Sequence, residues 1–324
     1  MFDKLIANLK SSKKTIVFTE GSDPRILSAA DRLIKENLMG VILCGNVDEV
    51  KAAAKNGGFN IDSAEILDPA TYPEMDALVA QMVELRKGKM TEEECRAALS
   101  KSNYFGTMLV KAGKADALLG GATYSTADTV RPALQIIKTK PGNSIVSSCF
   151  ILVRPSATGG NEVIAMADCA INISPSEDEL VEICGETIRC AKVFGIDPKV
   201  AFLSYSTHGS GSGDTVTKMR NATQKAIEEY PDTPIDGEFQ FDSAVSPRVA
   251  RQKCPDSPVA GYANTFIFPD INAGNIGYKI AQRMGNFEAY GPILLGLNAQ
   301  INDLSRGCNA IEVYSMAIIT ASLA

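Results

Sequence analysis

Histidine is almost absent from the sequence, and cysteine never occurs in the closely spaced pairs that bind metals. The only histidine is His208, and none of the eight cysteines forms a Cys-x-x-Cys pair. A structural zinc site needs four such ligands and is not expected, and a Ser-His-Asp mechanism would have to use His208 alone. With no export signal beside them, the scattered cysteines indicate reduced thiols in a cytoplasm.

Long apolar runs and basic runs are missing as well. No stretch of about 20 apolar residues would span a membrane, and the N-terminus MFDKLIANLKSSKKT lacks the apolar core of a secretory signal. The formal net charge is -6, and no basic run would neutralise nucleic-acid phosphates. We therefore expect neither a membrane nor a nucleic acid as partner, and an anionic ligand must be held by a few local arginines.

Short β-rich runs alternate with amphipathic segments along a chain of 324 residues, a length that favours two domains. The run TIVFTE predicts a buried strand, and Asp23 is the expected cap of a helix that begins at Pro24. Strands that alternate with helices predict parallel sheets with helices on both faces. Further strands are expected at residues 40–45, 64–68, 115–121, 144–155, 162–175, 199–207, 264–270 and 291–297.

A glycine-rich loop, HGSGSGD, lies between a predicted strand and a predicted helix. Its backbone N–H groups can face a phosphate, but Asp214 stands where the dinucleotide fingerprint requires its third glycine, which disfavours NAD binding. Alternatively, Asp214 caps the helix and the glycines only make the turn. We expect Thr207, His208 and Gly209 to contact a ligand, with His208 as a hydrogen-bonding or positioning residue rather than a general base.

A hydroxyl-rich turn, GGATYSTADTVRP, follows another predicted strand. The hydroxyls of Ser125 and Thr126, the N–H groups of a helix start and the guanidinium of Arg131 together suit a small oxyanion. The spacing fits a structural alternative equally well. In that alternative, Ser125 and Asp128 form a capping pair and Arg131 is a surface charge.

The stretch NDLSRGCNAIE puts Ser305, Arg306 and Cys308 close together before the last predicted helix. Asn309 with Glu312 three residues later matches an N-cap with an acid at the third helical position. A loop arginine such as Arg306 must go to solvent or to an anion. A nucleophilic Cys308 is disfavoured, because a free cysteine is more often a small buried apolar residue.

Taken together, these motifs resemble the phosphate acetyltransferase (phosphotransacetylase) family. The resemblance runs from EGSDPRIL to the last helix and is carried by GGATYSTADTVRP, LSYSTHGSGSGD, DGEFQFDSAV, PDSPVAGYANTFIFPDINAGNIGYKIAQR and GPILLGLNAQINDLSRGC. It implies that acetyl-CoA and phosphate, as substrates, are converted reversibly to acetyl phosphate and CoA. It also implies a homodimer. We expect no tightly bound cofactor and, because no cluster of metal ligands is visible, no metal.

The resemblance implies two α/β/α domains with mostly parallel sheets and an active-site cleft between the domains. It also implies a distant kinship of fold with the isocitrate and isopropylmalate dehydrogenases. The last segment returns to the first domain. The expected domains are therefore residues 1–146 with 296–324, and residues 147–295 as an insertion.

In the family, the serine and arginine of the SRG loop lie in the active site, and arginines matching Arg86 and Arg131 are implicated. Arg86 on its own is explained by a helix dipole, which favours a basic last turn. The family usually has an aspartate, proposed as base for the CoA thiol, where this chain has Glu312. The extra methylene can move the carboxylate by roughly 1 Å. The expected catalytic residues are Ser305, Arg306 and Glu312, and the expected substrate-binding residues are Arg86, Ser125, Thr126, Arg131, Thr207, His208, Gly209 and Asn302.

Four alternatives stay open at this point. Glu312 either accepts the thiol proton or only orients Arg306. The acyl group is either acetyl or, as in a phosphate butyryltransferase, butyryl. An NAD-dependent decarboxylating dehydrogenase on the related fold is weakly disfavoured by the failed glycine fingerprint, and a non-catalytic acyl-CoA-binding protein is disfavoured by the intact Ser305–Arg306 loop.

Overall fold

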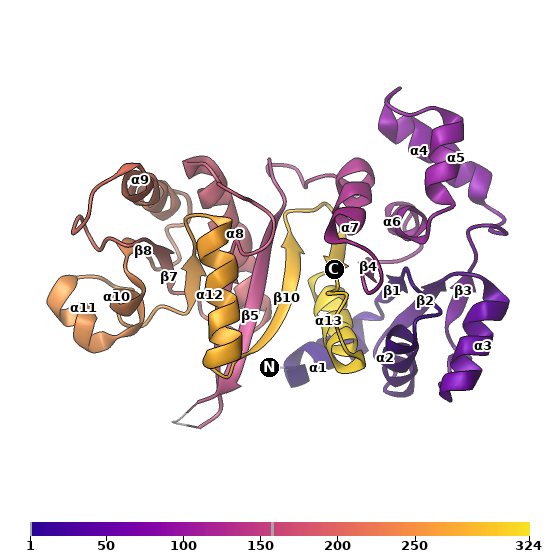
Figure 1. Cartoon of the computed structure of the whole chain (residues 1–324), viewed down its shortest axis with the longest axis horizontal. Coiled ribbons are helices and arrows are strands. Elements are labelled where there is room, and N and C mark those ends of the chain that lie inside the picture. The colour runs from indigo at the N-terminus through magenta and orange to yellow at the C-terminus, as the bar shows by residue number, and fades with distance from the viewer. Residues whose placement is uncertain (1, 157–158) are drawn as a thin grey trace. The chain divides into compact units, whose positions relative to one another are not determined.

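The computed structural model describes residues 2–156 and 159–324. The chain forms two compact units (Figure 1). Unit 1 comprises Met1–Pro141 and Leu297–Ala324, and unit 2 comprises Gly142–Gly296. Each unit is a sheet covered by helices, so the expected α/β class with mostly parallel sheets is confirmed.

The sheet of unit 1 has five parallel strands in the order β11-β4-β1-β2-β3. The chain builds outward from β1 to β2 and β3, and then returns to place β4 on the other side of β1. In open parallel sheets, ligands bind beyond the carboxyl ends of the strands at such a reversal. The loops after β1 and β4 therefore mark the edge where a site is expected. The strands are β1 Thr15–Phe18, β2 Gly40–Cys44, β3 Glu65–Leu67, β4 Ala117–Gly120 and β11 Gln300–Asp303.

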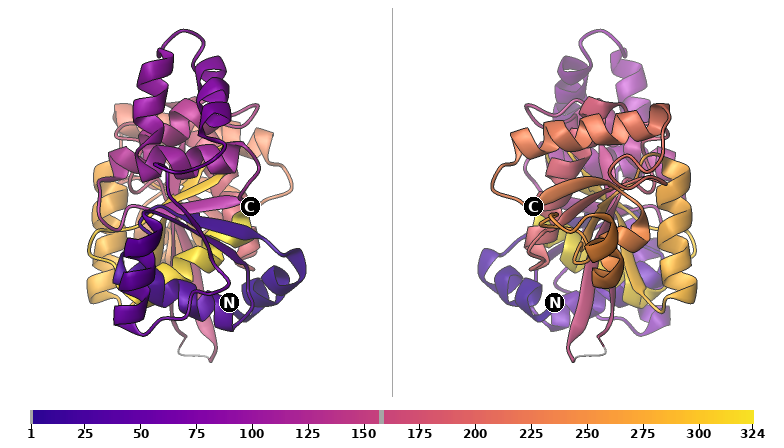
Figure 2. Two further views of the ribbon diagram at one scale, coloured as in Figure 1. Left: turned by 90° about the vertical axis from the view of Figure 1, so that its right-hand side faces the viewer. Right: turned by 90° about the vertical axis from the view of Figure 1, so that its left-hand side faces the viewer.

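Helices cover both faces of this sheet (Figure 1). One face carries α1 Phe2–Ser12, α2 Pro24–Lys35, α3 Val47–Gly57 and α13 Ala310–Leu323. The other face carries α4 Met75–Arg86, α5 Glu92–Leu99, α6 Ser102–Lys111 and α7 Thr126–Pro132, which continues as the π-helix η1 Ala133–Ile137. Figure 2 shows α4 and α5 as a helical pair that extends away from the sheet.

Local sequence signals account for the ends of several helices in unit 1. The side chain of Asp23 accepts a hydrogen bond from the backbone N–H of Arg25, and Pro24 is the first residue of α2, as predicted. Asn309 and Glu312 form a complete capping box at the start of α13, also as predicted. The core behind these helices is apolar, with Val17, Leu118 and Ile301 of the strands packed against α6.

The sheet of unit 2 has six strands in the order β10-β5-β6-β9-β7-β8. Strands β6, β9, β7 and β8 run parallel, but β5 is antiparallel to both β6 and β10. β5 ends at Pro155 and β6 begins at Asn161, and that connection is too short for the crossover that parallel strands need. The strands are β5 Ser147–Pro155, β6 Asn161–Ala167, β7 Val200–Leu203, β8 Ile235–Phe239, β9 Thr265–Ile267 and β10 Glu288–Leu295.

Five helices of unit 2 lie within the described residues: α8 Glu177–Val193, α9 Asp214–Glu229, α10 Phe241–Val245, α11 Pro247–Lys253 and α12 Ile271–Met284. The interpretation of Asp214 as the cap of α9 is wrong. Gly213 is the N-cap, and Asp214 is the first helical residue. The backbone of Gly213 has φ of 146°, which residues with a side chain rarely adopt, so glycine takes the capping position.

Candidate functional site

The loop between β11 and α13 is held in place by a guanidinium from α2. Arg25 Nη1 donates to the carbonyl oxygens of Arg306, at 2.9 Å, and Cys308, at 3.2 Å. Arg25 Nη2 donates to Asp23 Oδ2, at 2.8 Å, and to the carbonyl oxygen of Ala122, at 2.9 Å. Burial acts to raise the pKa of Asp23, but its bonds with Arg25 outweigh it and lower this pKa. Arg25 thus joins the loops after β1, β4 and β11.

Ser305 and Arg306 are exposed at the tip of this loop. Ser305 Oγ accepts from the backbone N–H of Gly307 at 3.3 Å. Within the ranges that the structure describes, neither the Ser305 hydroxyl proton nor the Arg306 guanidinium has a protein acceptor. A hydroxyl donor and a cation are therefore both available to a ligand at the carboxyl end of β11.

Glu312 is exposed in the first turn of α13, and its carboxylate has a structural partner. Its Oε2 accepts from the backbone N–H of Asn309 at 2.9 Å, and Asn309 Oδ1 accepts from the backbone N–H of Glu312 at 2.9 Å. The capping box therefore fixes the direction in which the carboxylate points. It also occupies one of the two carboxylate oxygens.

Sequence reasoning missed a half-buried carboxylate in the loop after β1, that of Glu20. Its Oε1 accepts from the backbone N–H groups of Gly121, at 3.1 Å, and Thr123, at 3.0 Å, while Oε2 accepts from the Thr19 hydroxyl at 2.8 Å. Burial raises the pKa of Glu20, although these hydrogen bonds act in the opposite direction. Glu20 thus fastens the hydroxyl-rich turn to β1, and its position after an apolar strand run was the available signal.

Sequence reasoning also missed Asp303, the last residue of β11. Its carboxylate accepts from the hydroxyls of Thr126, at 2.6 Å, and Thr129, at 2.5 Å, both on α7. Its side chain is 1% exposed, and burial raises its pKa. The side chains of Ser125 and Asp128 do meet, because Ser125 Oγ donates to Asp128 Oδ2 at 2.7 Å, but the Ser125 side chain makes no capping hydrogen bond to the backbone of α7.

Arg86 and Arg131 lie on the face of unit 1 that α4, α6 and α7 cover. Arg86 Nη1 donates to the carbonyl oxygen of Gln135 at 3.2 Å, and Arg86 Nε is buried with no hydrogen-bond partner in the described part of the chain. Arg131 is exposed on α7. Burial raises the pKa of the nearby Tyr104, and the charges of both arginines oppose this rise. The two arginines therefore share one electrostatic neighbourhood.

Asn302 is completely buried and points away from Asp303, because successive residues of a strand face opposite sides of the sheet. Its Nδ2 donates to the Thr320 hydroxyl of α13 at 2.9 Å, and its Oδ1 accepts from Gln300 at 3.0 Å. These contacts tie β11 to α13. The structure thus gives Asn302 protein partners on the side of the sheet opposite α7.

The predicted binding residues Thr207, His208 and Gly209 belong to unit 2, where their loop closes on the buried carboxylate of Glu238. Gly209 N–H donates to Glu238 Oε1 at 2.8 Å, and Arg220 Nε donates to Oε2 at 3.2 Å. Thr207 Oγ1 accepts from the backbone N–H of Gln240 at 2.9 Å, and His208 Nε2 lies 3.3 Å from Asp236 Oδ1. The Gly209 N–H group therefore faces a carboxylate of the protein itself.

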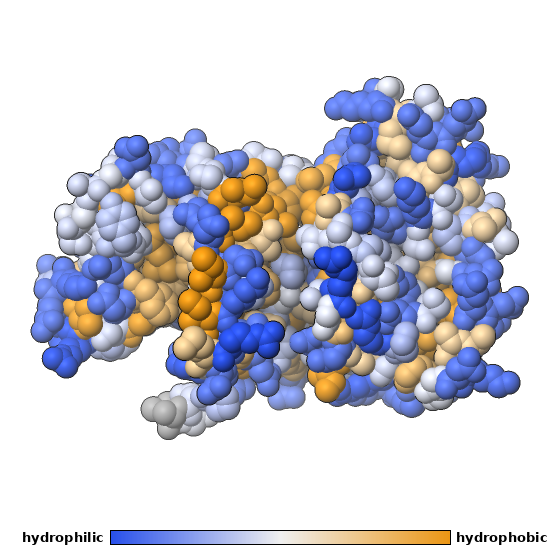
Figure 3. Space-filling model, viewed as in Figure 1, coloured by the Kyte–Doolittle hydropathy of each residue, from blue (hydrophilic) through white to orange (hydrophobic). Residues whose placement is uncertain are grey.

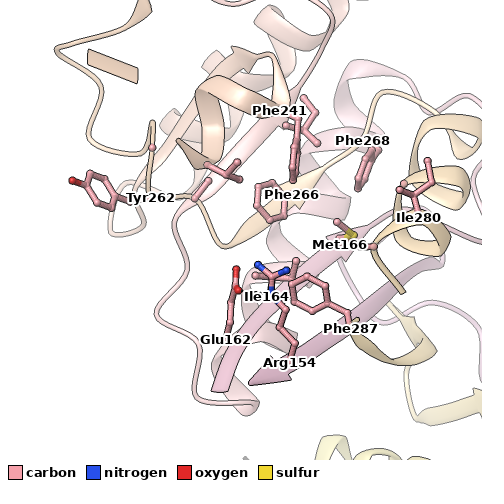
Figure 4. Close-up of a pocket in the computed structure, with 16 residues that line it drawn as sticks. Arg154, Glu162, Ile164, Met166, Phe241, Tyr262, Phe266, Phe268, Ile280 and Phe287 are labelled. Carbon is pink, nitrogen blue, oxygen red and sulfur yellow. Dashed lines mark hydrogen bonds and ion pairs between the residues drawn. The ribbon is translucent and has the colours of Figure 1, made fainter. Parts of the chain in front are cut away.

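Each unit contains a cavity. In unit 1, a polar cavity of about 570 Å³ lies at the carboxyl edge of the sheet, lined by Glu20, Asp23, Asn46, Asp68 and Thr123 among others. In unit 2, an apolar cavity of about 710 Å³ is lined by Ile280 of α12 and by four phenylalanines, Phe241 of α10, Phe266 of β9, Phe268 just after β9 and Phe287 just before β10 (Figure 4). None of the predicted site residues lines either cavity.

Comparison with known proteins identifies the family. The model of the family described as phosphate acetyl/butaryl transferase matches residues 1–321. The chain belongs to this family. It is 54% identical over 309 residues to the phosphate acetyltransferase of Bacillus subtilis, covering 95% of this chain and 94% of that protein.

Two solved structures extend the comparison to the fold. A phosphotransacetylase from Streptococcus pyogenes has 50% identity and a TM-score of 0.96, covering 99% of this chain and 97% of that one. A putative 4-hydroxythreonine-4-phosphate dehydrogenase from Salmonella typhimurium has 12% identity and a TM-score of 0.54, covering 97% and 100%. The second likeness shows a shared fold alone. Family membership thus favours the transferase over the dehydrogenase alternative.

Two further properties concern the described residues alone. No helix among them is both long and apolar enough to cross a membrane. No group of three or more His, Cys, Asp and Glu side chains in the ranges 2–156 and 159–324 is arranged to hold a metal ion.

Proposed function

We propose that this chain transfers an acetyl group reversibly between CoA and inorganic phosphate, in a complex that holds both substrates. The observation that carries the proposal is the exposed Ser305–Arg306 pair at the carboxyl end of β11, whose hydroxyl proton and guanidinium have no acceptor within the described residues. The 54% identity to a phosphate acetyltransferase supports the same reaction.

Arg306, with Arg86 and Arg131, would hold the phosphate group and offset the charge of the tetrahedral transition state. All three guanidinium groups lack an acidic partner among the described residues, whereas Arg25, Arg32 and Arg96 form ion pairs. The Ser305 hydroxyl would donate to the oxygen of the acyl group as it gains negative charge. In this proposal, catalysis comes mainly from the positioning of two substrates.

The reaction needs no acyl-enzyme. The CoA sulfur attacks the acetyl carbon of acetyl phosphate, a C–S bond forms, and the C–O bond to phosphate breaks with its electron pair leaving on phosphate. Cys308 is the cysteine of the loop, but it is 7% exposed, and burial raises the pKa of its thiol. A protonated, buried thiol is a poor nucleophile, which supports direct transfer.

We propose that Glu312 accepts the proton of the CoA thiol, with orientation of Arg306 as the alternative role. The exposed carboxylate and its fixed direction in the capping box support a catalytic position. Because Oε2 already accepts from Asn309, the proton would go to Oε1 or require the capping bond to open. Thr207 and His208 remain proposed substrate contacts. A donated contact from Ser125, Gly209 or Asn302 would require its hydrogen bond to Asp128, Glu238 or Thr320 to open.

The experiment that tests the function is an assay of thioester formation from acetyl phosphate and CoA, followed by the absorbance of the thioester. We expect turnover with phosphate release equal to thioester formed. Acyl specificity is tested with acetyl-, propionyl- and butyryl-CoA in the reverse direction. Acetyl should give the highest kcat/KM, because each extra methylene in a fitted pocket changes binding by roughly 1–3 kcal/mol.

We propose that the enzyme is a homodimer and acts in the cytoplasm. An apolar stripe on α12, formed by Ile276, Ile280 and Met284, is more than half exposed (Figure 3). It borders the apolar cavity of unit 2 (Figure 4). Contiguous apolar surface of this kind marks interaction sites, and a two-fold interface uses the same patch on both copies. All eight cysteines are free thiols, which supports a reducing compartment.

Light scattering with size-exclusion chromatography tests the homodimer. Wild type should have twice the mass of one chain, and Ile280→Glu should shift the mass towards one chain while the protein stays folded. Ile227→Glu is the matched control, because Ile227 is exposed on α9 and lies outside the stripe. A wild-type mass of one chain would contradict the dimer, and an unchanged Ile280→Glu dimer would place the interface elsewhere.

A further inference from the structure

Asp303 is a buried carboxylate without a cation. It is 1% exposed and accepts from the hydroxyls of Thr126 and Thr129, and no Lys or Arg among the described residues forms an ion pair with it. Burial of an unpaired charge is unfavourable in a protein interior, because the charge loses its hydration and gains no opposite charge. An apolar residue of similar size would avoid this cost, so the folded core alone does not explain the aspartate.

The position of Asp303 connects two proposed parts of the active site. Ser305 and Arg306 follow it by two and three residues. The two threonines that bind it lie in the first turn of α7, the helix that carries Arg131. The Asp303 carboxylate therefore joins the strand end that leads to Arg306 directly to the helix that carries Arg131.

The backbone on both sides allows the Asp303 carboxylate to lie close to the loop after β4. The N–H of Leu304 donates to the carbonyl oxygen of Gly120 at 2.7 Å, which fixes the end of β11 beside β4. Gly121 has φ of 97°, and a Cβ atom on it would collide with Asp303 Oδ1. Only a glycine leaves room for the carboxylate at this point. The contact is thus specified by both loops.

We propose that Asp303, through the hydroxyls of Thr126 and Thr129, is a positioning residue that sets the distance between the Ser305–Arg306 loop and the arginine of α7. This role rests on the proposed acetyl transfer. Asp303 is not itself catalytic, because its carboxylate is enclosed by α7. Two hydrogen bonds to one rigid carboxylate hold the supporting residues more narrowly than apolar packing does, and catalytic geometry tolerates errors of only about 0.5 Å.

Thr126 then holds Asp303 rather than the oxyanion that its sequence motif indicates. Its hydroxyl proton goes to Asp303 Oδ2, so it is not available to donate to a phosphate oxygen. Thr126→Val keeps the shape of the side chain and removes the hydroxyl. Thr126→Ser keeps the hydroxyl. The pair separates loss of the hydrogen bond from loss of packing.

The kinetic test compares kcat and KM for acetyl phosphate and CoA at a temperature where each variant is folded. We expect Asp303→Ala to lower kcat by about 100-fold, the size of effect that a 1 Å misplacement produces. Thr126→Val should lower kcat by roughly 10-fold and Thr126→Ser by less than about threefold. KM should change by less than about threefold in each, because the binding groups themselves remain.

Asp116→Asn is the matched control. Asp116 precedes β4 at the amino ends of the same parallel strands, away from the proposed site, and accepts from Thr15 N–H at 2.8 Å. Its kcat should stay within about twofold of wild type. If Asp303→Ala does not fold, Thr126→Val with Thr129→Val carries the same test. Wild-type kcat in a folded Asp303→Ala or Thr126→Val/Thr129→Val protein would overturn the proposal.

A double-mutant cycle separates positioning from direct binding. If Thr126 acts through Asp303, the Thr126→Val/Asp303→Ala protein should be no slower than Asp303→Ala, because the second change removes a hydroxyl that has already lost its acceptor. If Thr126 instead contacts substrate, the two losses of kcat should multiply and KM for acetyl phosphate should rise. The second result would overturn the assignment of Thr126.

Hydrogen exchange gives a readout that does not depend on activity. Thr126→Val should speed exchange of the amides in residues 126–131 and 304–308 by about 10-fold, and Thr126→Ser should not. If wild type fails to transfer acetyl, the proposed function fails, yet this exchange still decides whether the contact positions both segments. Unchanged exchange in Thr126→Val would overturn the positioning role whatever the activity.

Discussion

At the scale of single residues, the structure separates side chains that serve the fold from those left to a ligand. Arg25 is fully engaged with protein oxygens, whereas Arg306 offers only its backbone carbonyl to the protein. Glu312 belongs to both groups, since it caps α13 and stays exposed. Glu312 is therefore the residue of this loop that can combine a structural role with a catalytic one.

Glu312 gives the first prediction. Glu312→Gln should lower kcat by about 100-fold with little change in KM, because an amide keeps the capping bond but accepts no proton. Glu312→Asp should retain most activity, since a carboxylate stays at the position. Steady-state kinetics with acetyl phosphate and CoA measure both. Wild-type turnover in Glu312→Gln would remove Glu312 as the base.

Cys308, unlike Glu312, should be dispensable for turnover. Cys308→Ala should keep more than about half of the wild-type kcat, because the buried thiol, whose pKa is raised by burial, takes no part in transfer. Mass spectrometry of wild type mixed with acetyl phosphate should find no acetylated cysteine. Loss of activity together with a thioester on Cys308 would establish a covalent route instead.

At the scale of elements, loops are held to one another by charged side chains that bond to backbone groups of several loops. Arg25 joins three loops of unit 1, and Glu238 gathers the glycine-rich loop of unit 2. The side chains of Arg25 and Glu238 take the place of water as hydrogen-bond partners of backbone groups, which makes the loops rigid. Replacement of either side chain should therefore loosen every loop that it joins. Substitution of Arg25 should therefore affect unit 1, and substitution of Glu238 should affect unit 2.

Arg25→Lys should loosen the loop after β11. A lysine keeps the charge but lacks the planar fork that bonds to Asp23, Ala122 and Arg306 at once. We expect kcat/KM to fall by about 10- to 100-fold while the melting temperature falls by only a few degrees. Kinetics and thermal denaturation of the same sample check this. A large fall in the melting temperature together with the fall in kcat/KM would indicate general unfolding instead.

Glu238 should make unit 2 sensitive to acid. Burial acts to raise its pKa, but Arg220 and the N–H of Gly209 outweigh burial, and the pKa lies below its ordinary value of 4.5. The stabilisation is thus complete above about pH 4.5 and is lost as the pH falls through the lower, folded-state pKa. Glu238→Gln should flatten this part of the pH dependence. Thermal denaturation of both proteins between pH 3 and about 7 measures it.

Short sequence patterns predicted the helices, strands and caps well. They did not predict contacts between residues that are far apart in the sequence. Pro24 after Asp23 and the Asn309–Glu312 pair are short-range patterns, and both caps are confirmed. The bond between Asp303 and Thr126 joins residues far apart in sequence, and only the pairing of β11 with β4 brings them together. Asp214 failed as a cap because glycine fits the required backbone better than an acid does.

At the scale of the whole molecule, the two units differ in how the chain builds them. Unit 2 is one continuous segment, and its ends meet where Leu295 pairs with Ser147 across β10 and β5. Unit 1 needs the C-terminal segment, because β11 forms one edge of its sheet and α13 packs on α2. A fragment should therefore fold alone only if it contains all the segments of one unit.

The fragment 142–296 should fold alone, with a single cooperative thermal transition and its own apolar core. The fragment 1–141 should not, because loss of α13 exposes apolar side chains of α2 and loss of β11 leaves β4 at an open edge. Joining residue 141 to residue 297 by a short glycine-serine linker should restore folding. The junction is short, since the N–H of Asn298 donates to the carbonyl oxygen of Lys138 at 2.9 Å. Circular dichroism melts of the three proteins decide this, and a cooperative transition in 1–141 would contradict a discontinuous unit 1.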